Sequence, residues 1–127
     1  MTRTLHRVTC KAAIYDETRR YVLHVIYTPT ASGIPGGHLE EGEDPDSAMH
    51  RELQEELGFV PDNLERKDFF LHHDGKIVLG YVATCSKDQD FVVDETEIRE
   101  VHWIRVEDIR SGKIIINSYG DFIVKWA

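Results

Sequence analysis

Residues 37–59 read GHLEEGEDPDSAMHRELQEELGF and contain the strongest local structural signal in the chain. Asp44 is a favourable N-cap residue, and Pro45 suits the first position of a helix because its fixed φ is already helical. Gly58 stands where many helices end in a left-handed residue. The stretch therefore predicts a helix over residues 45–57.

The predicted helix gathers three carboxylates beside an apolar stripe. At about 100° per residue, the stripe that we expect to face the core consists of Met49, Leu53 and Leu57. Next to it lie the carboxylates of Glu52, Glu55 and Glu56. These carboxylates repel one another, and the last turn of a helix prefers positive charge. Two interpretations remain open: a solvated acidic face, or a site for a hard divalent cation such as Mg²⁺, which takes oxygen ligands and bridges to phosphate.

A glycine-rich segment precedes this helix. We predict that residues 28–37 form a loop, because Gly33, Pro35, Gly36 and Gly37 interrupt any regular element. Glycines lack a Cβ atom and so let the backbone approach a ligand closely. Because the loop leads directly into the acidic helix, a ligand-binding interpretation gains weight over that of a plain connector.

The remaining elements are strands and helices in alternation. The predicted strands are residues 5–15, 21–27, 69–73, 76–84 and 101–106, with Asp74-Gly75 as a hairpin turn. A short helical turn is predicted at 107–111 and a closing helix at 117–126. Strands on both sides of a central helix indicate an α/β domain with mixed strand pairing. With no repeat or linker in the sequence, residues 1–127 are predicted to form one domain.

Composition and charge narrow the classes of function. The 127 residues carry a net charge of −8, which does not suit non-specific nucleic-acid binding, so no nucleic-acid partner is expected. A phosphate-rich substrate would have to be bound through cations. No apolar run resembles a signal core or a membrane span, which predicts a cytoplasmic location and no membrane partner. Cys10 and Cys85 lie in apolar, strand-like runs and are predicted to be buried free thiols.

Residues 37–59 resemble a complete Nudix box. The family pattern is G-x5-E-x7-R-E-U-x-E-E-x-G-U, where U is a bulky apolar residue. Its fixed positions are matched here by Gly37, Glu43, Arg51, Glu52, Leu53, Glu55, Glu56, Gly58 and Phe59. The resemblance implies the Nudix α/β/α sandwich, with a mixed sheet between helices and a loop–helix–loop catalytic motif. It also implies that residues 1–127 form a single Nudix hydrolase domain.

The same resemblance implies roles for individual residues. The ligands of Mg²⁺, for which Mn²⁺ may substitute, would be Glu52, Glu55 and Glu56, with the carbonyl of Gly36 or Gly37 as a further ligand. Arg51 would pair with Glu43 and orient the neighbouring glutamates. Glu52 is the first candidate for the general base. Some family members use an acid from a later loop instead, for which the candidates are Asp94, Glu95 and Glu97; Glu40 is an additional candidate ligand.

The sequence leaves the substrate class open. Ser32 occupies the place of a tryptophan found in many relatives, and the ADP-ribose, diadenosine-polyphosphate, coenzyme A and NADH signatures are absent. The start GGHLEEGE resembles MutT-type relatives, which favours a nucleoside triphosphate pyrophosphohydrolase. The alternatives are a nucleotide-sugar or dinucleotide pyrophosphatase and a non-catalytic nucleotide-binding sensor. Because relatives often form dimers, a homodimer is compatible with the resemblance.

Several side chains outside the helix are candidates for substrate contacts. We single out His38, Tyr27 and Tyr81, and note that strand aromatics such as Phe70 and Trp103 more often belong to a core. His72 and His73 are adjacent in a predicted strand, where successive side chains point in opposite directions. We therefore expect no metal to be shared by this histidine pair.

Overall fold

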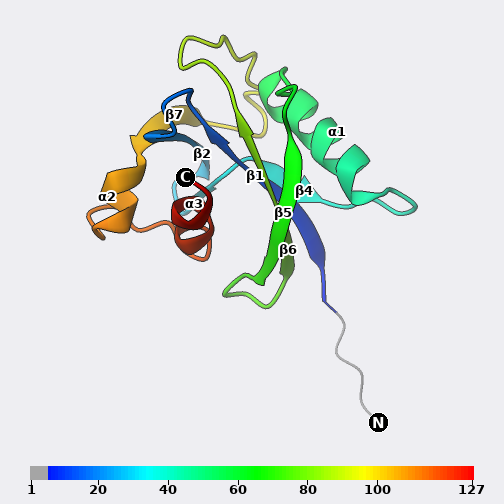
Figure 1. The fold of residues 1–127 in the computed structure, drawn as a ribbon. Coiled ribbons are helices and arrows are strands. Elements are labelled where there is room, and N and C mark those ends of the chain that lie inside the picture. Colours follow the sequence, from blue (N-terminus) through cyan, green and yellow to red (C-terminus); the bar gives the residue numbers. More distant parts are fainter. Residues whose placement is uncertain (1–5) are drawn as a thin grey trace.

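The computed structural model describes residues 6–127, which form a seven-stranded mixed sheet with helices on both faces (Figure 1). The strands are β1 (Val8–Tyr15), β2 (Tyr21–Thr28), β3 (Ala31–Gly33), β4 (Gly36–His38), β5 (Glu65–Leu71), β6 (Ile77–Thr84) and β7 (Glu100–Arg105). The helices are α1 (Pro45–Leu57), α2 (Val106–Arg110) and α3 (Gly120–Trp126).

Strand β1 organises the sheet. It pairs in parallel with β6 along its whole length, from Val8 opposite Ile77 to Tyr15 opposite Thr84, whereas the other strand pairs are antiparallel. Two strands share the other edge of β1. Strand β2 pairs with it only at Tyr15, and β4 pairs with residues 9–11. The predicted mixed pairing is confirmed, and the glycines of β4 lie against the middle of the sheet.

The two faces of the sheet carry separate cores. In β1, Ala12 and Ile14 pack with α1 on one face, while Ala13 and Tyr15 pack on the other face with α2 and α3. This alternation follows the two-residue period of a strand, and burial on both faces explains why β1 is so continuously apolar. Figure 1 shows α1 on one side of the sheet and the α2–α3 pair on the other. The predicted α/β/α sandwich is therefore confirmed.

Helix α1 has the predicted bounds and caps. The Asp44 side chain accepts a hydrogen bond from the Ser47 amide at 2.9 Å, and Gly58 ends the helix in a left-handed conformation with φ 62°. The apolar stripe of Met49, Leu53 and Leu57 is fully buried. At the first turn, the Tyr81 hydroxyl of β6 donates to the Asp46 carboxylate at 2.5 Å, which fixes the helix on the sheet.

The segment before α1 differs from the prediction. Residues 28–37 were expected to form a loop, but they contain β3 and the start of β4. Strand β3 forms a hairpin with β2, and β4 pairs with β1. Both strands have only three residues and are specified by their partners in the sheet, so their local sequence carries no strand pattern.

Other element bounds also needed correction. The closing helix begins at Gly120 instead of residue 117, because Ser118 has a φ of 64°, which a right-handed helix does not accommodate. Strand β5 begins at Glu65, four residues before the predicted start and ends at Leu71. The first strand begins at Val8, and its predicted start at residue 5 lies outside the described residues. The last strand and the short helix each begin one residue earlier than predicted.

Both cysteines are free thiols, as predicted. Cys10 is fully buried in the core beside α1, whereas Cys85 is only half-buried, at the end of β6. Burial raises the pKa of both thiols to about 11. Within residues 6–127, no helix has the length and apolar character needed to cross a membrane.

The contact between Tyr81 and Asp46 yields a test of the fold. Tyr81→Phe removes the hydroxyl donor and leaves the Asp46 carboxylate without it, so the free energy of unfolding is expected to fall by about 1.5–3 kcal/mol. Urea denaturation at constant m-value measures this change. The matched control is Tyr21→Phe, because this half-buried tyrosine contacts Lys87 through its ring, which phenylalanine retains. Equal stability of the two variants would contradict the assigned role.

Candidate active site

The glycines of β4 allow the carboxylates of α1 to lie directly against the sheet. A Cβ atom built at Gly37 would lie 2.5 Å from the carboxyl carbon of Glu52. At Gly36, where φ is +143°, a Cβ would overlap the carbonyl oxygen of Cys10. Backbone atoms exclude a side chain at Gly36, whereas a Cβ at Gly37 would require the Glu52 carboxylate to move; with glycine there, Glu52 packs on the backbone of β4.

Glu56 is the most enclosed carboxylate of the site. Its side chain is buried, and its Oε1 accepts a hydrogen bond from the Gly36 amide at 2.7 Å. Burial raises the pKa of Glu56 above its ordinary value, while nearby Lys11 and hydrogen bonds from Tyr27 and Gly36 oppose that rise. The carboxylate is thus held by neighbouring polar groups.

Arg51 connects the other carboxylates. Its guanidinium binds Glu43 in a bidentate manner, at 2.7 Å and 3.0 Å, so the pair implied by the box pattern is present. The same guanidinium donates to Glu52 at 3.1 Å and to Glu55 at 3.2 Å, and it reaches the His38 carbonyl. This single side chain therefore sets the orientation of two glutamates relative to the loop before α1.

The donor set suits a hard divalent cation, although the ligands are not yet gathered around one point. Glu52, Glu55 and Glu56 supply carboxylate oxygens, and Gly36 and Gly37 add backbone carbonyls. Within residues 6–127, no three acidic, histidine or cysteine side chains lie close enough to share an ion. Arg51 holds two of the glutamates and Gly36 holds the third, so a cation would have to compete with these hydrogen bonds.

The acids outside the helix occupy different places. Glu97 lies near enough to Glu52 to raise its pKa, an effect secondary to burial, and the Asp94 amide donates to the Glu56 carbonyl at 3.3 Å. Glu95 instead lines a separate hollow beside Phe91. Glu40 lies 3.5 Å from the Arg51 guanidinium. Glu97 and Asp94 are therefore the loop acids that lie near the box, Glu97 through its charge and Asp94 through a backbone hydrogen bond.

A polar hollow of about 380 Å³ lies on the α3 face of the sheet, opposite to α1, and none of the box glutamates is among its lining residues. Its walls come from β1, β2, the turn between β5 and β6, and the segment before α3, and include Lys11, Tyr27, His72, Lys76, Asn117 and Tyr119. The Lys11 ammonium links the hollow to the box, because it donates to the Gly36 carbonyl at 3.2 Å. Of the substrate contacts predicted from the sequence, Tyr27 lies here.

The other predicted contacts lie elsewhere. The Tyr81 side chain is buried in the α1-side core, where its hydroxyl binds Asp46, so we no longer count it among substrate contacts. His38 is exposed on β4 and its ring lies 2.8 Å from the Thr9 hydroxyl. Trp103 packs against the α1-side core and Phe70 against the opposite one, as expected for strand aromatics. The sequence analysis had missed Lys11, although a lysine inside an apolar strand was a signal that could have been used.

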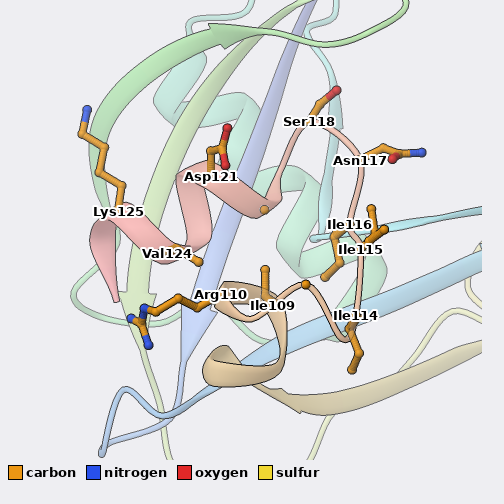
Figure 2. Close-up of a pocket in the computed structure, with 12 residues that line it drawn as sticks. Ile109, Arg110, Ile114, Ile115, Ile116, Asn117, Ser118, Asp121, Val124 and Lys125 are labelled. Carbon is orange, nitrogen blue, oxygen red and sulfur yellow. The ribbon is translucent and has the colours of Figure 1, made fainter.

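A second hollow, of about 480 Å³, lies between α2 and α3 (Figure 2). Isoleucines and Val124 make up much of its wall, and none of the carboxylates of the box reaches it. Residues 115–117 line both hollows and thus run between them. The polar hollow is the one connected to the candidate site, because its Lys11 donates to the Gly36 carbonyl.

Solved structures of low sequence identity share this fold. The NUDIX domain of Shewanella oneidensis NrtR, solved with ADP ribose, has a TM-score of 0.77 at 18% identity, covering 96% of this chain and 86% of that one. A Caenorhabditis elegans Ap4A hydrolase has a TM-score of 0.73 at 22% identity, covering 93% and 94%. MutT from Methanosarcina mazei has a TM-score of 0.72 at 20% identity, covering 99% and 96%.

A relative with a similar amino-acid sequence is also found. An m7GpppN-mRNA hydrolase of Caenorhabditis elegans is 32% identical over an alignment of 85 residues, and the match covers 64% of this chain. The match spans only 11% of the length of that curated relative. The family model described as the NUDIX domain matches residues 5–121, which include the whole box and all the strands. Box, sheet and family model agree, and the chain belongs to the Nudix hydrolase family.

Proposed function

We propose that this protein hydrolyses a phosphoanhydride bond in a nucleoside diphosphate linked to another group, in a Mg²⁺-dependent reaction. Nucleoside triphosphates, as for MutT-like enzymes, are the leading substrate class, with a monophosphate and pyrophosphate as products. The observation that carries the proposal is the close approach of Glu52 and Glu56 to the Gly36–Gly37 backbone beside an open hollow. Metal-assisted phosphoryl transfer needs such an oxygen-rich site next to space for a substrate.

The metal ligands in this proposal are Glu52, Glu55 and Glu56, with a carbonyl of Gly36 or Gly37. Bound there, Mg²⁺ or Mn²⁺ would acidify a water molecule and offset the negative charge of the phosphate oxygens. Arg51 would orient Glu52 and Glu55 through its hydrogen bonds to them, because Glu43 anchors the far side of its guanidinium. In the proposal, residues 1–127 act as one Nudix domain.

Glu52 is the proposed general base. Burial raises the pKa of its carboxyl above the ordinary value, which strengthens its affinity for a proton. The water oxygen bonds to phosphorus and its proton passes to Glu52. The bond from that phosphorus to the bridging oxygen breaks, and the leaving phosphate keeps the electron pair. Glu97 is the second candidate, because its charge acts on Glu52.

A dinucleotide substrate is the second candidate class. The relative from Caenorhabditis elegans is named for hydrolysis of m7GpppN-mRNA, in which a chain of phosphates joins two nucleosides. Its 32% identity to this chain favours the dinucleotide class over nucleotide sugars. The products distinguish the candidates, because a triphosphate releases pyrophosphate and a dinucleotide releases two nucleotides.

A substrate panel tests the proposed activity. The purified protein is incubated with Mg²⁺ and nucleoside triphosphates, including oxidised ones, dinucleotides or nucleotide sugars. Released phosphate is counted with and without added phosphatase. We expect Mg²⁺-dependent turnover that falls by at least about 100-fold in Glu52→Gln and in the Glu55→Gln, Glu56→Gln double variant. Glu107→Gln is the control, because this exposed glutamate pairs with Arg110 on α2.

The outcomes of the panel separate three conclusions. Turnover that persists in the glutamate variants would remove these residues from the mechanism. Absence of turnover with any substrate, together with tight nucleotide binding, would identify a non-catalytic sensor. Activity without added Mg²⁺ and in the presence of EDTA would contradict the metal requirement.

Gly37 provides a second test, based on packing alone. Gly37→Ala would force the Glu52 carboxylate away from β4, because the new Cβ would lie 2.5 Å from its carboxyl carbon. A displacement of about 1 Å at a catalytic group is expected to lower kcat by about 100-fold. Gly120→Ala is the matched control, since a Cβ there makes only a 3.5 Å contact with Ile109. The explanation fails if Gly37→Ala retains full activity in a folded protein.

A further inference from the structure

The hollow beside the box has an unusual charge distribution for this protein. The chain as a whole carries a net charge of −8, and carboxylates crowd helix α1. In contrast, the charged or titratable basic side chains that line the hollow are Lys11, His72, His73 and Lys76, and no carboxylate is among its lining residues. Two lysine side chains therefore line one confined space in an acidic molecule.

Lys11 is the side chain that most needs an explanation. It is only 8% exposed, and within residues 6–127 its ammonium forms no ion pair with a carboxylate. It donates to the Gly36 carbonyl and to the Tyr27 hydroxyl, both at 3.2 Å. An ammonium group has three N–H donors, so one donor remains for a ligand in the hollow. Buried lysines are rare unless they are paired, because removing the charge from water is costly.

Lys76 stands at the turn between β5 and β6, on another wall of the hollow. Its ammonium lies 3.6 Å from Asp74, which also binds the His72 ring at 3.0 Å. This turn is tied to the segment before α3, because the His73 amide donates to the Ser118 hydroxyl at 2.9 Å. Lys76 is thus held in place by contacts that leave it on the wall of the hollow.

We propose that this hollow binds an anionic, phosphorylated group of the substrate, with Lys11 and Lys76 as its donors. The inference rests on the proposed function and narrows its substrate class. The substrate would carry at least one phosphate beyond the two that flank the cleaved bond, as nucleoside triphosphates and dinucleoside polyphosphates do. Nucleotide sugars have only the two flanking phosphates, with an uncharged sugar in place of a third, and are disfavoured. Lysine ammonium groups bind phosphate as compact point charges, and a volume of about 380 Å³ is in the range of small-ligand sites.

The test uses inorganic tripolyphosphate as the probe, in the presence of EDTA so that no metal bridges it to the glutamates. Calorimetry is performed on the wild type, Lys76→Gln and Lys11→Met. Each variant is expected to bind the probe about tenfold more weakly, which is the effect of losing one charge-assisted hydrogen bond. Added salt should weaken binding to the wild type. Lys67→Gln is the control, because this lysine of β5 pairs with Glu65 and lies outside the hollow.

Kinetics supplies an independent readout for the same variants. For a polyphosphate substrate, Lys76→Gln is expected to raise KM about tenfold while kcat changes little, because the lysine binds the substrate but not the reacting atoms. The KM for a nucleotide sugar should stay the same. Since Lys11 is buried, Lys76→Gln keeps the test decisive if Lys11→Met does not fold.

The results separate this inference from the proposed function. Turnover by the wild type, with tripolyphosphate affinity and KM unaffected in a folded Lys76→Gln variant, would overturn the anion-binding role of the hollow and leave the proposed hydrolase activity intact. Lysine-dependent binding of tripolyphosphate without turnover of any substrate would support the anion-binding role of the hollow and contradict the proposed hydrolase activity. Nucleotide sugars as the preferred substrates, with KM independent of both lysines, would also overturn the inference.

Discussion

The close approach of helix α1 to strand β4 is the constraint on which the candidate site depends. Gly37 lacks the Cβ that would meet the Glu52 carboxylate of the helix, and Gly36 lacks the Cβ that would overlap the Cys10 carbonyl of β1. Because of this, the Glu52 carboxylate packs on the strand and Glu56 reaches the Gly36 amide. Pairing of β4 with β1 holds the strand, while the capped and buried helix holds the carboxylates. Fold and site are therefore two consequences of one packing arrangement.

This arrangement has an electrostatic cost that the protein offsets with its own donors. Carboxylates that lose water need hydrogen bonds or positive charge in return. Arg51 provides both to Glu52 and Glu55, and its planar guanidinium is fixed by bidentate binding to Glu43. Glu56 relies on the Gly36 amide and on the nearby charge of Lys11. The glutamates are thus restrained by partners within the chain, and a cation bound there would have to compete with those partners.

In the proposed function, the box and the hollow would divide the chemical tasks between different kinds of structure. The box residues come from one helix and the loop before it, so their spacing along the chain determines their geometry. The hollow is built from four distant parts of the chain, including Lys11 in β1 and Asn117 before α3. A rigid helix suits the geometry of metal-assisted chemistry, whereas turns and loops can vary to suit different substrates. Such a division explains why the family pattern identifies the reaction more readily than the substrate.

The sequence by itself determined helix α1, its caps and the Glu43–Arg51 pair, because these depend on residues close together in the chain. It also indicated the mixed α/β sandwich, through the pattern of apolar segments and the box. Only the tertiary structure decided that β3 and β4 are strands, because three-residue strands are stabilised by their partners in the sheet. It also decided that Tyr81 belongs to the core and that Lys11, Lys76 and Tyr27 share a hollow. Burial and charge neighbourhood depend on chain segments far apart in sequence, so a local pattern could single out Lys11 in its apolar strand but not the residues that surround it.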